Sequence, residues 1–195
     1  MKKLLAVVLA VGLCAAGCGT NDHDQEPPVE ITGLHWVSGP SGLTYPTTDQ
    51  GPFEKAPVPH GFDDSETGAV IAAVTGQVFM AGADDRTWPV VSQYLLEPGP
   101  GRDQWAQARS LISVNGTVAH QPEFLGYRVE HDNNTTVVVL ATRYPTGEVT
   151  AYPIQVSHAS GQWKVVVPSQ GTEPDLTEIN DDQLAQFISF HPDQG

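Results

Sequence analysis

Apolar residues run almost without interruption from Ala69 to Met80, and helix signals lie on both sides of this run. Ser65 precedes it at the position of an N-cap, beside acidic residues that favour a helix N-terminus. Gly82 and the acids after it indicate where the helix stops. Small residues recur at every fourth position, which predicts a smooth stripe that another element can approach closely: Gly68, Ala72 and Gly76.

Two shorter helices are predicted to follow. The segment Thr87–Leu96 has helical character and tolerates Pro89, because proline fits the first turn of a helix. The sequence EPGPG at 97–101 breaks the pattern. Residues 102–112 then form a predicted amphipathic helix whose apolar side carries Trp105, Ala108 and Leu111 or Ile112.

After Pro122 the period of the apolar positions changes to two, which is typical of β-strands. Four strands are predicted, at about residues 125–130, 136–144, 149–156 and 163–167. The turns between them carry Asn, Pro and Gly at 132–134, 145–147 and 160–161, so the strands form an antiparallel meander of hairpins. The tail, residues 181–190, could form a short final helix.

This order of elements predicts an α+β fold in which about three N-terminal helices pack on one face of a four-stranded antiparallel meander. A single α+β domain over residues 61–195 suits the length of the chain. Large aromatic residues are expected to build the core between helices and sheet: Phe79, Trp88, Trp105, Phe124 and Trp163.

The first residues have the layout of an export signal. A positive start at Lys2 and Lys3 precedes the apolar run Leu4–Leu13 and then small residues up to Cys18. The end of this segment, Ala15-Ala16-Gly17-Cys18, resembles the lipobox of bacterial lipoproteins, although Ala15 replaces the more usual Leu or Val. That resemblance implies a signal peptide over residues 1–17, cleavage before Cys18, and a lipid such as palmitate attached to Cys18.

Other interpretations of the cysteine pair remain. Cys14 and Cys18 could begin a metal site, but such a site usually takes four Cys, His or carboxylate ligands in close spacing, and only His23 and the acids at 22, 24 and 26 are near. An ordinary secretory signal cut elsewhere, or an uncleaved anchor, is also compatible with the segment. Residues 18–60 are rich in Gly, Pro and acids and predict a tether and irregular lead-in, in which Trp36 and Tyr45 could pack on the domain.

The charge of the chain limits its partners. Nine Lys and Arg against 23 Asp and Glu give a formal net charge of −14. Such a surface repels nucleic acid and anionic lipid headgroups, so the expected membrane contact is the lipid anchor alone and no nucleic acid is expected as a partner.

Short motifs carry a resemblance to a known family. W-V-x-G at 36–39, Gly51-Pro52 and G-F-x-x-S-x-x-G-A-V-I-A-A at 61–73 resemble uncharacterised actinobacterial lipoproteins and secreted proteins. That family often has Thr-Pro where this chain has Ser65-Glu66. The element order also resembles the cystatin-like or nuclear transport factor 2-like roll. These resemblances imply a link to mobile elements or to envelope machinery such as conjugation channels, and they transfer no catalytic residue.

No motif in the chain specifies a reaction. The seven histidines make no metal-binding pattern, although His131 and His158 lie near predicted strand ends and could meet. Nucleophile elbows and phosphate loops are absent. If the roll encloses a cavity, Tyr94, Tyr127 and Asp103 could reach it. Sequons at Asn115, Asn133 and Asn134 are better explained as turns.

Together these observations favour a non-catalytic protein-binding or assembly domain on an extracytoplasmic protein, anchored to the cell membrane through Cys18. The expected partner is another envelope protein, and no cofactor or metal is expected. A small-ligand binder or an enzyme using the interior of the roll is the alternative, and a simple spacer is a third.

Overall fold

The computed structural model describes residues 31–132 and 135–191. Its centre is helix α1, Glu66–Gly82, in which 13 of 17 residues are buried. A helix that is apolar on all sides must be covered on all sides, and α1 contacts both β-sheets of the fold. The hydroxyl of Ser65 accepts a hydrogen bond from the backbone N–H of Gly68 at 3.0 Å. The predicted helix and its N-cap are therefore confirmed.

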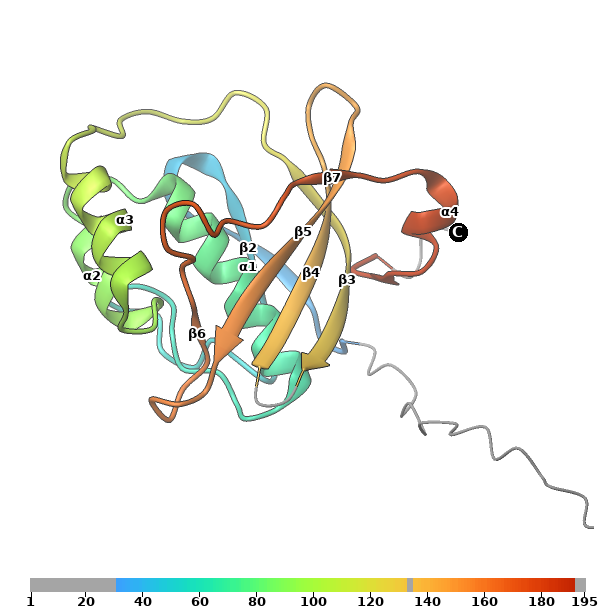
Figure 1. The fold of residues 1–195 in the computed structure, drawn as a ribbon, viewed down its shortest axis with the longest axis horizontal. Coiled ribbons are helices and arrows are strands. Elements are labelled where there is room, and N and C mark those ends of the chain that lie inside the picture. Colours follow the sequence, from blue (N-terminus) through green and yellow to red (C-terminus); the bar gives the residue numbers. More distant parts are fainter. Residues whose placement is uncertain (1–30, 133–134, 192–195) are drawn as a thin grey trace, which may run out of the picture.

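The larger sheet is antiparallel and has six strands in the described part of the chain. Its long strands lie side by side in the middle (Figure 1), and three two-residue strands pair at its edges. The order is β6-β5-β4-β3-β8, with β7 also paired to β5. The bounds are β3 Glu123–Asp132, β4 Thr135–Arg143, β5 Val149–Ser157, β6 Lys164–Val165, β7 Thr177–Glu178 and β8 Ile188–Ser189.

A two-stranded sheet precedes the helices. Strands β1, His35–Ser38, and β2, Thr44–Thr47, form a hairpin around the short 3₁₀ turn η1, Pro40–Gly42. Tyr45 meets Phe79 of α1 edge to face, with ring centroids 5.4 Å apart. Trp36 stacks on Phe124 of β3 at 6.1 Å. The packed fold thus extends well before Gly61, and Trp36 and Tyr45 attach its first part to the core.

The remaining helices are short. Helix α2, Trp88–Tyr94, packs on α1, and helix α3, Pro100–Ser110, packs on α2; both lie on the side of α1 away from β3 (Figure 1). Helix α4, Asp181–Leu184, is a single turn closed by a capping box in which Asn180 and Gln183 exchange side-chain and backbone hydrogen bonds. None of the helices in the described ranges is long and apolar enough to cross a membrane.

The expectation of three N-terminal helices on a four-stranded meander is wrong, although the fold is α+β. Strands β1 and β2 come before the helices, and the tail adds β7 and β8 to the larger sheet. Because that element order is not found, the expected cystatin-like or nuclear transport factor 2-like roll is also wrong. Strands of two residues are too short to show an alternating pattern, so their pairing depends on neighbours distant in the sequence.

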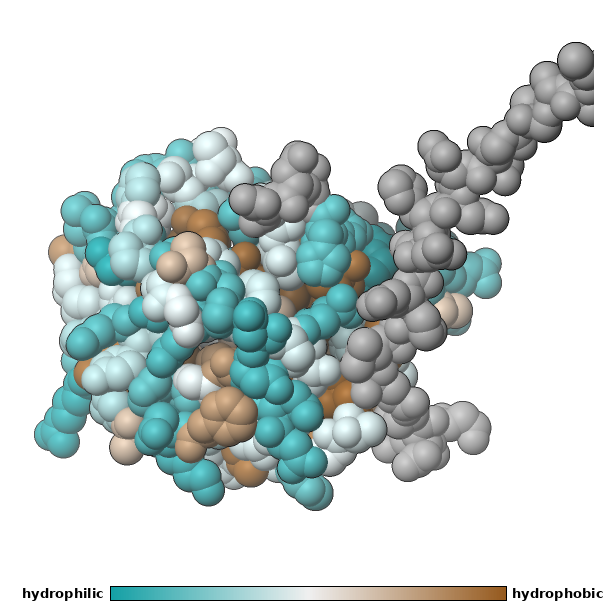
Figure 2. All heavy atoms as spheres, turned by 90° about the horizontal axis from the view of Figure 1, so that it is seen from below, coloured by the Kyte–Doolittle hydropathy of each residue, from teal (hydrophilic) through white to brown (hydrophobic). Residues whose placement is uncertain are grey.

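The apolar side predicted for the third helix is also partly wrong. The helix ends at Ser110, and the side chains that follow point into solvent: Leu111 is 85 % exposed and Ile112 is 60 % exposed. Figure 2 shows that the face seen from below is mostly hydrophilic, with small separate apolar patches.

The contact between α1 and β6 depends on a glycine. A Cβ atom added to Gly76 would lie 2.4 Å from Cγ2 of Val165, well inside van der Waals contact. Val165 is 2 % exposed and is stiff because it is β-branched, so it has little room to move. The predicted small-residue stripe is therefore confirmed at Gly76, where it lets strand β6 approach α1 closely.

A buried arginine joins the ends of α1 and α3. Arg109 donates to the carbonyl oxygens of Ala83 at 2.8 Å and Ile112 at 2.7 Å. It also lies 3.2 Å from the carboxylate of Asp85, which accepts further hydrogen bonds from the Ser113 hydroxyl and the Val114 N–H. These hydrogen bonds, that of Ser113 first, lower the pKa of Asp85. Asp85 thereby holds the start of the long segment that leads to β3.

We predict that Gly76→Ala lowers the free energy of unfolding by about 1–2 kcal/mol, because overpacking against Val165 exceeds the gain in helix propensity. Urea unfolding measures the change. The double variant Gly76→Ala, Val165→Ala should lower the free energy of unfolding by less than the sum of the two single changes, because the smaller side chain at 165 removes the clash. Strict additivity would contradict the contact.

We predict that the ionised carboxylate of Asp85 stabilises the fold and that this contribution to the free energy of unfolding is lost at acidic pH. Its pKa is lower in the folded protein than in the unfolded chain, so its contribution is complete well above pH about 4 and is lost as the pH falls further. Asp85→Asn should therefore be less stable than the native chain at pH 7, and the difference should shrink towards pH 3. Urea midpoints across this range test it, with the exposed Asp175→Asn as control. A difference that stays constant with pH would exclude this role.

Candidate functional site

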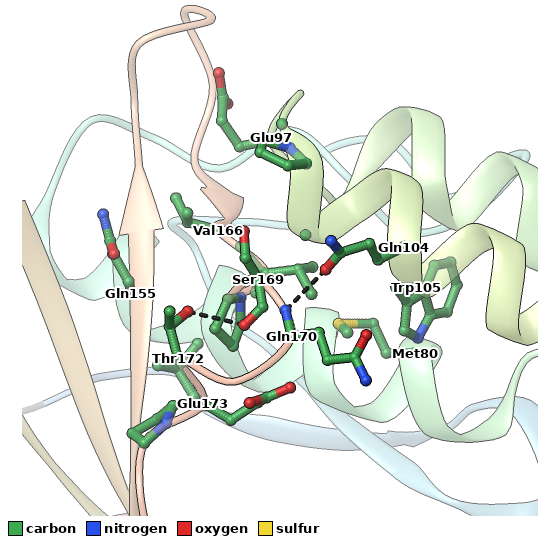
Figure 3. A pocket seen from close by; sticks show the side chains of 18 of the residues that line it. Met80, Glu97, Gln104, Trp105, Gln155, Val166, Ser169, Gln170, Thr172 and Glu173 are labelled. Atoms are coloured by element: carbon green, nitrogen blue, oxygen red, sulfur yellow. Dashed lines mark hydrogen bonds between the residues drawn. The ribbon is translucent and has the colours of Figure 1, made fainter.

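A cavity of about 950 Å³ lies between strand β5, helix α3 and the loop that follows β6. We call it the β5–α3 cavity. Figure 3 shows Gln155 on β5 at one side, Gln104 and Trp105 on α3 at the other, and the 168–174 loop between them. Met80 of α1 belongs to the same lining.

The cavity exists because the edge of β5 loses its partner midway. Val166 donates to the carbonyl of Gln155 at 2.9 Å, and β7 pairs with β5 only from Thr177 onwards. Continued pairing from β6 would bring Pro168 opposite Pro153. Neither residue has a backbone N–H, so the ladder cannot continue there. The chain leaves the sheet, and the loop encloses the space beside β5.

The lining combines apolar surface with amide groups. Its apolar part comes from five side chains in particular: Met80, Trp105, Tyr152, Ile154 and Val167. Its amides come from one glutamine each on α1, α3, β5 and the loop: Gln77, Gln104, Gln155 and Gln170. The side-chain oxygen of Gln104 accepts from the backbone N–H of Gln170 at 2.8 Å, which fastens the loop to α3 (Figure 3).

Every formal charge on this lining is negative. Glu97 and Glu173 line the cavity, and Figure 3 places them at opposite ends of it. Glu97 accepts from the Ser160 hydroxyl at 3.1 Å, and Glu173 accepts from the Gly171 N–H at 2.6 Å. Within the described ranges, neither glutamate forms an ion pair, and no Lys, Arg or His lines the cavity.

One of these acids, Glu173, acts electrostatically on Tyr152. Burial raises the pKa of the Tyr152 phenol, and the negative charge of Glu173 raises it further. The two carboxylates make the electrostatic potential in the cavity negative, which disfavours anions and favours cations.

The residues suggested from sequence for an interior cavity do not come together. Tyr127 is 1 % exposed and packs on Phe190 in the core. Tyr94 packs on the ring of His60, with centroids 4.5 Å apart. Asp103 is exposed and pairs with Arg102 at 2.8 Å. None of the three lines the β5–α3 cavity.

The two histidines near strand ends each contact a carboxylate at the start of α1. His131 lies 3.4 Å from Glu66, and His158 lies 3.2 Å from Asp64. The described residues contain no group of three or more His, Cys, Asp or Glu arranged to hold a metal ion. Cys18, Cys14 and the proposed signal peptide 1–17 lie outside the described residues.

Sequence reasoning missed the residues that form this site. Tyr152, Gln155 and Glu173 were not singled out, because they belong to a strand and a loop with no motif. The one available signal was proline: Pro153 interrupts a strand pattern and Pro168 follows the last predicted strand, both of which favour a break in pairing.

Comparison with known proteins identifies the family of this chain. No curated protein and no solved structure is significantly similar to this chain. Residues 12–187 match a family described as a domain of unknown function, DUF8175. The match includes the β1–β2 hairpin, all three longer helices, the central strands and most of the tail. The chain therefore belongs to the DUF8175 family.

Proposed function

We propose that this chain is a lipid-anchored protein of the cell envelope whose domain binds another envelope protein without catalysing a reaction. The anchor is a lipid on Cys18, attached after removal of residues 1–17. Residues 18–30 serve as the tether, because they are rich in polar and small residues. The domain then lies outside the cell membrane and is held close to it.

The observation that carries the binding role is the chemistry of the β5–α3 cavity. It offers apolar surface, four side-chain amides and two carboxylates, which suit recognition. Its hydroxyl groups, on Ser169, Thr172 and Tyr152, have no histidine or lysine beside them in the lining that could act as a base. Thr172 instead donates to the carbonyl of Ser169 at 2.8 Å.

A role in envelope machinery linked to mobile elements is the finer form of this proposal. It is supported by the motifs at 36–39, 51–52 and 61–73, which resemble uncharacterised lipoproteins and secreted proteins, some of them associated with mobile elements. The net charge of −14 supports a protein partner over nucleic acid.

The size of the cavity favours a second candidate function, the binding of a small ligand. Its volume of about 950 Å³ lies within the range of roughly 300–1,000 Å³ that small-molecule sites occupy. Native mass spectrometry of the purified chain distinguishes the two, because a small ligand adds a discrete mass to the monomer.

We predict that Cys18→Ala abolishes incorporation of a clickable fatty acid into the chain, because the acceptor sulfur is lost. Gel fluorescence after labelling in cells measures it. Cys14→Ala is the matched control and should label normally, since Cys14 belongs to the removed peptide. Equal labelling of Cys18→Ala and the native chain would refute the anchor.

We predict that a photo-crosslinking amino acid at Gln104 or Gln170 yields a protein adduct in intact membranes, whereas one at Glu148 yields none. Both glutamines line the cavity and are exposed, while Glu148 is exposed on the β4–β5 turn. Immunoblotting detects the adduct. A chain that stays monomeric with all three probes would contradict a protein partner.

A further inference from the structure

The β5–α3 cavity contains a backbone acceptor that neither β6 nor β7 uses. The carbonyls of Val149 and Gln155 accept hydrogen bonds from Ile179 and Val166 on the outer side of β5. Because backbone groups alternate along a strand, the carbonyl of Pro153 faces the same side. Neither the pairing of β5 with β6 nor its pairing with β7 includes Pro153. An extended chain entering the cavity could donate an N–H to it.

The amides of the lining suit the same kind of occupant. Gln104 uses its side-chain oxygen on Gln170 and keeps its NH₂ group as a donor. Gln155 and Gln170 are exposed and carry both a donor and an acceptor. A side-chain amide matches the donor and acceptor of a peptide group, and the apolar wall around Trp105 and Ile154 can take up an alternating side chain.

The negative charge of the lining favours an occupant that carries positive charge. Glu97 and Glu173 are the charged groups of the lining, and no described base neutralises either one. Glu173 also acts on Tyr152, since its charge contributes to the raised pKa of that phenol. A carboxylate next to an aromatic ring attracts a guanidinium or ammonium group, through an ion pair and a cation–π contact together.

We propose that the β5–α3 cavity binds an extended, basic segment of the partner protein, with a Lys or Arg side chain held between Tyr152 and Glu173. This inference rests on the proposed protein-binding function and names the chemistry of the partner. Complementary charge also accelerates encounter between the acidic domain and a basic segment.

The test uses the full chain purified from membranes in mild detergent. The probe is a fluorescently labelled heptapeptide in which valine alternates with arginine, and matched probes carry glutamine or glutamate instead of arginine. Fluorescence anisotropy measures the dissociation constants at low and high salt. We expect the basic peptide to bind at least about tenfold more tightly than the neutral one, less tightly as salt rises, and the acidic peptide not to bind.

Variants locate the binding. Glu173→Gln keeps the acceptor for the Gly171 N–H and should weaken the basic peptide about two- to fivefold, the effect of losing one partly exposed charge pair. Glu97→Gln combined with it should weaken binding further. Glu148→Gln removes an equal charge outside the cavity and should leave binding unchanged. Equal weakening by Glu148→Gln would show general attraction to an acidic chain and overturn the proposal.

Two further outcomes separate the possibilities. If free arginine amide competes with the peptide at equal concentration, the cavity binds a small cation and the extended segment is refuted. If cavity crosslinks capture a protein but the three peptides bind equally, the protein-binding function stands and the basic segment is wrong. Thermal unfolding of each variant confirms that it is folded.

Discussion

The burial of helix α1 is the constraint on which the rest of the structure depends. Thirteen of its 17 residues are shielded from water, and it has no polar face to present. Each neighbouring element must therefore cover part of it: the β1–β2 hairpin on one side, the central strands on another, and α2 near its end. Gly76 permits the closest of these approaches, since β6 can press on the helix only where no side chain intervenes. The long apolar run of α1 and the short edge strand β6 are thus linked, because the helix must be buried and the strand buries part of it.

The position of the cavity follows from that packing together with two prolines. Val165 packs against Gly76 of α1. Its carbonyl accepts a hydrogen bond from the Glu97 N–H, and its own N–H donates to the Leu95 carbonyl, with N to O distances of 2.8 and 2.9 Å. The strand therefore cannot shift to find another register. Once Pro153 and Pro168 prevent pairing, the chain has to bend away, and Gly101 allows it to cross tightly over the start of α3. The cavity is open because β6 is held in place and because Pro153 and Pro168 have no backbone N–H with which to continue the pairing.

Much of the framework could be predicted from the sequence, and the reasons for the failures are physical. The α1 helix and the strands β3, β4 and β5 are long enough for capping residues and alternation to identify them. The pairs at Thr177 and Ile188 depend on partners more than 25 residues away in sequence, and two residues contain no period. Leu111 and Ile112 continue a helical pattern beyond the point where Arg109 ends the packed part of the helix. Tyr94, Tyr127 and Asp103 are expected in the interior of a roll that this topology does not form, whereas Tyr152 and Glu173 line the same cavity because the sheet edge is broken.

The tail pairs with both margins of the larger sheet. The segment that forms β7 on the margin of β5 continues through α4 and forms β8 on the opposite margin, beside β3 (Figure 1). A single stretch of chain thereby occupies backbone groups on both outer strands. Unpaired margins of a sheet are templates for pairing with another chain. The last part of the chain thus covers a short stretch of each margin, and losing it would leave those backbone groups of β5 and β3 without their partners.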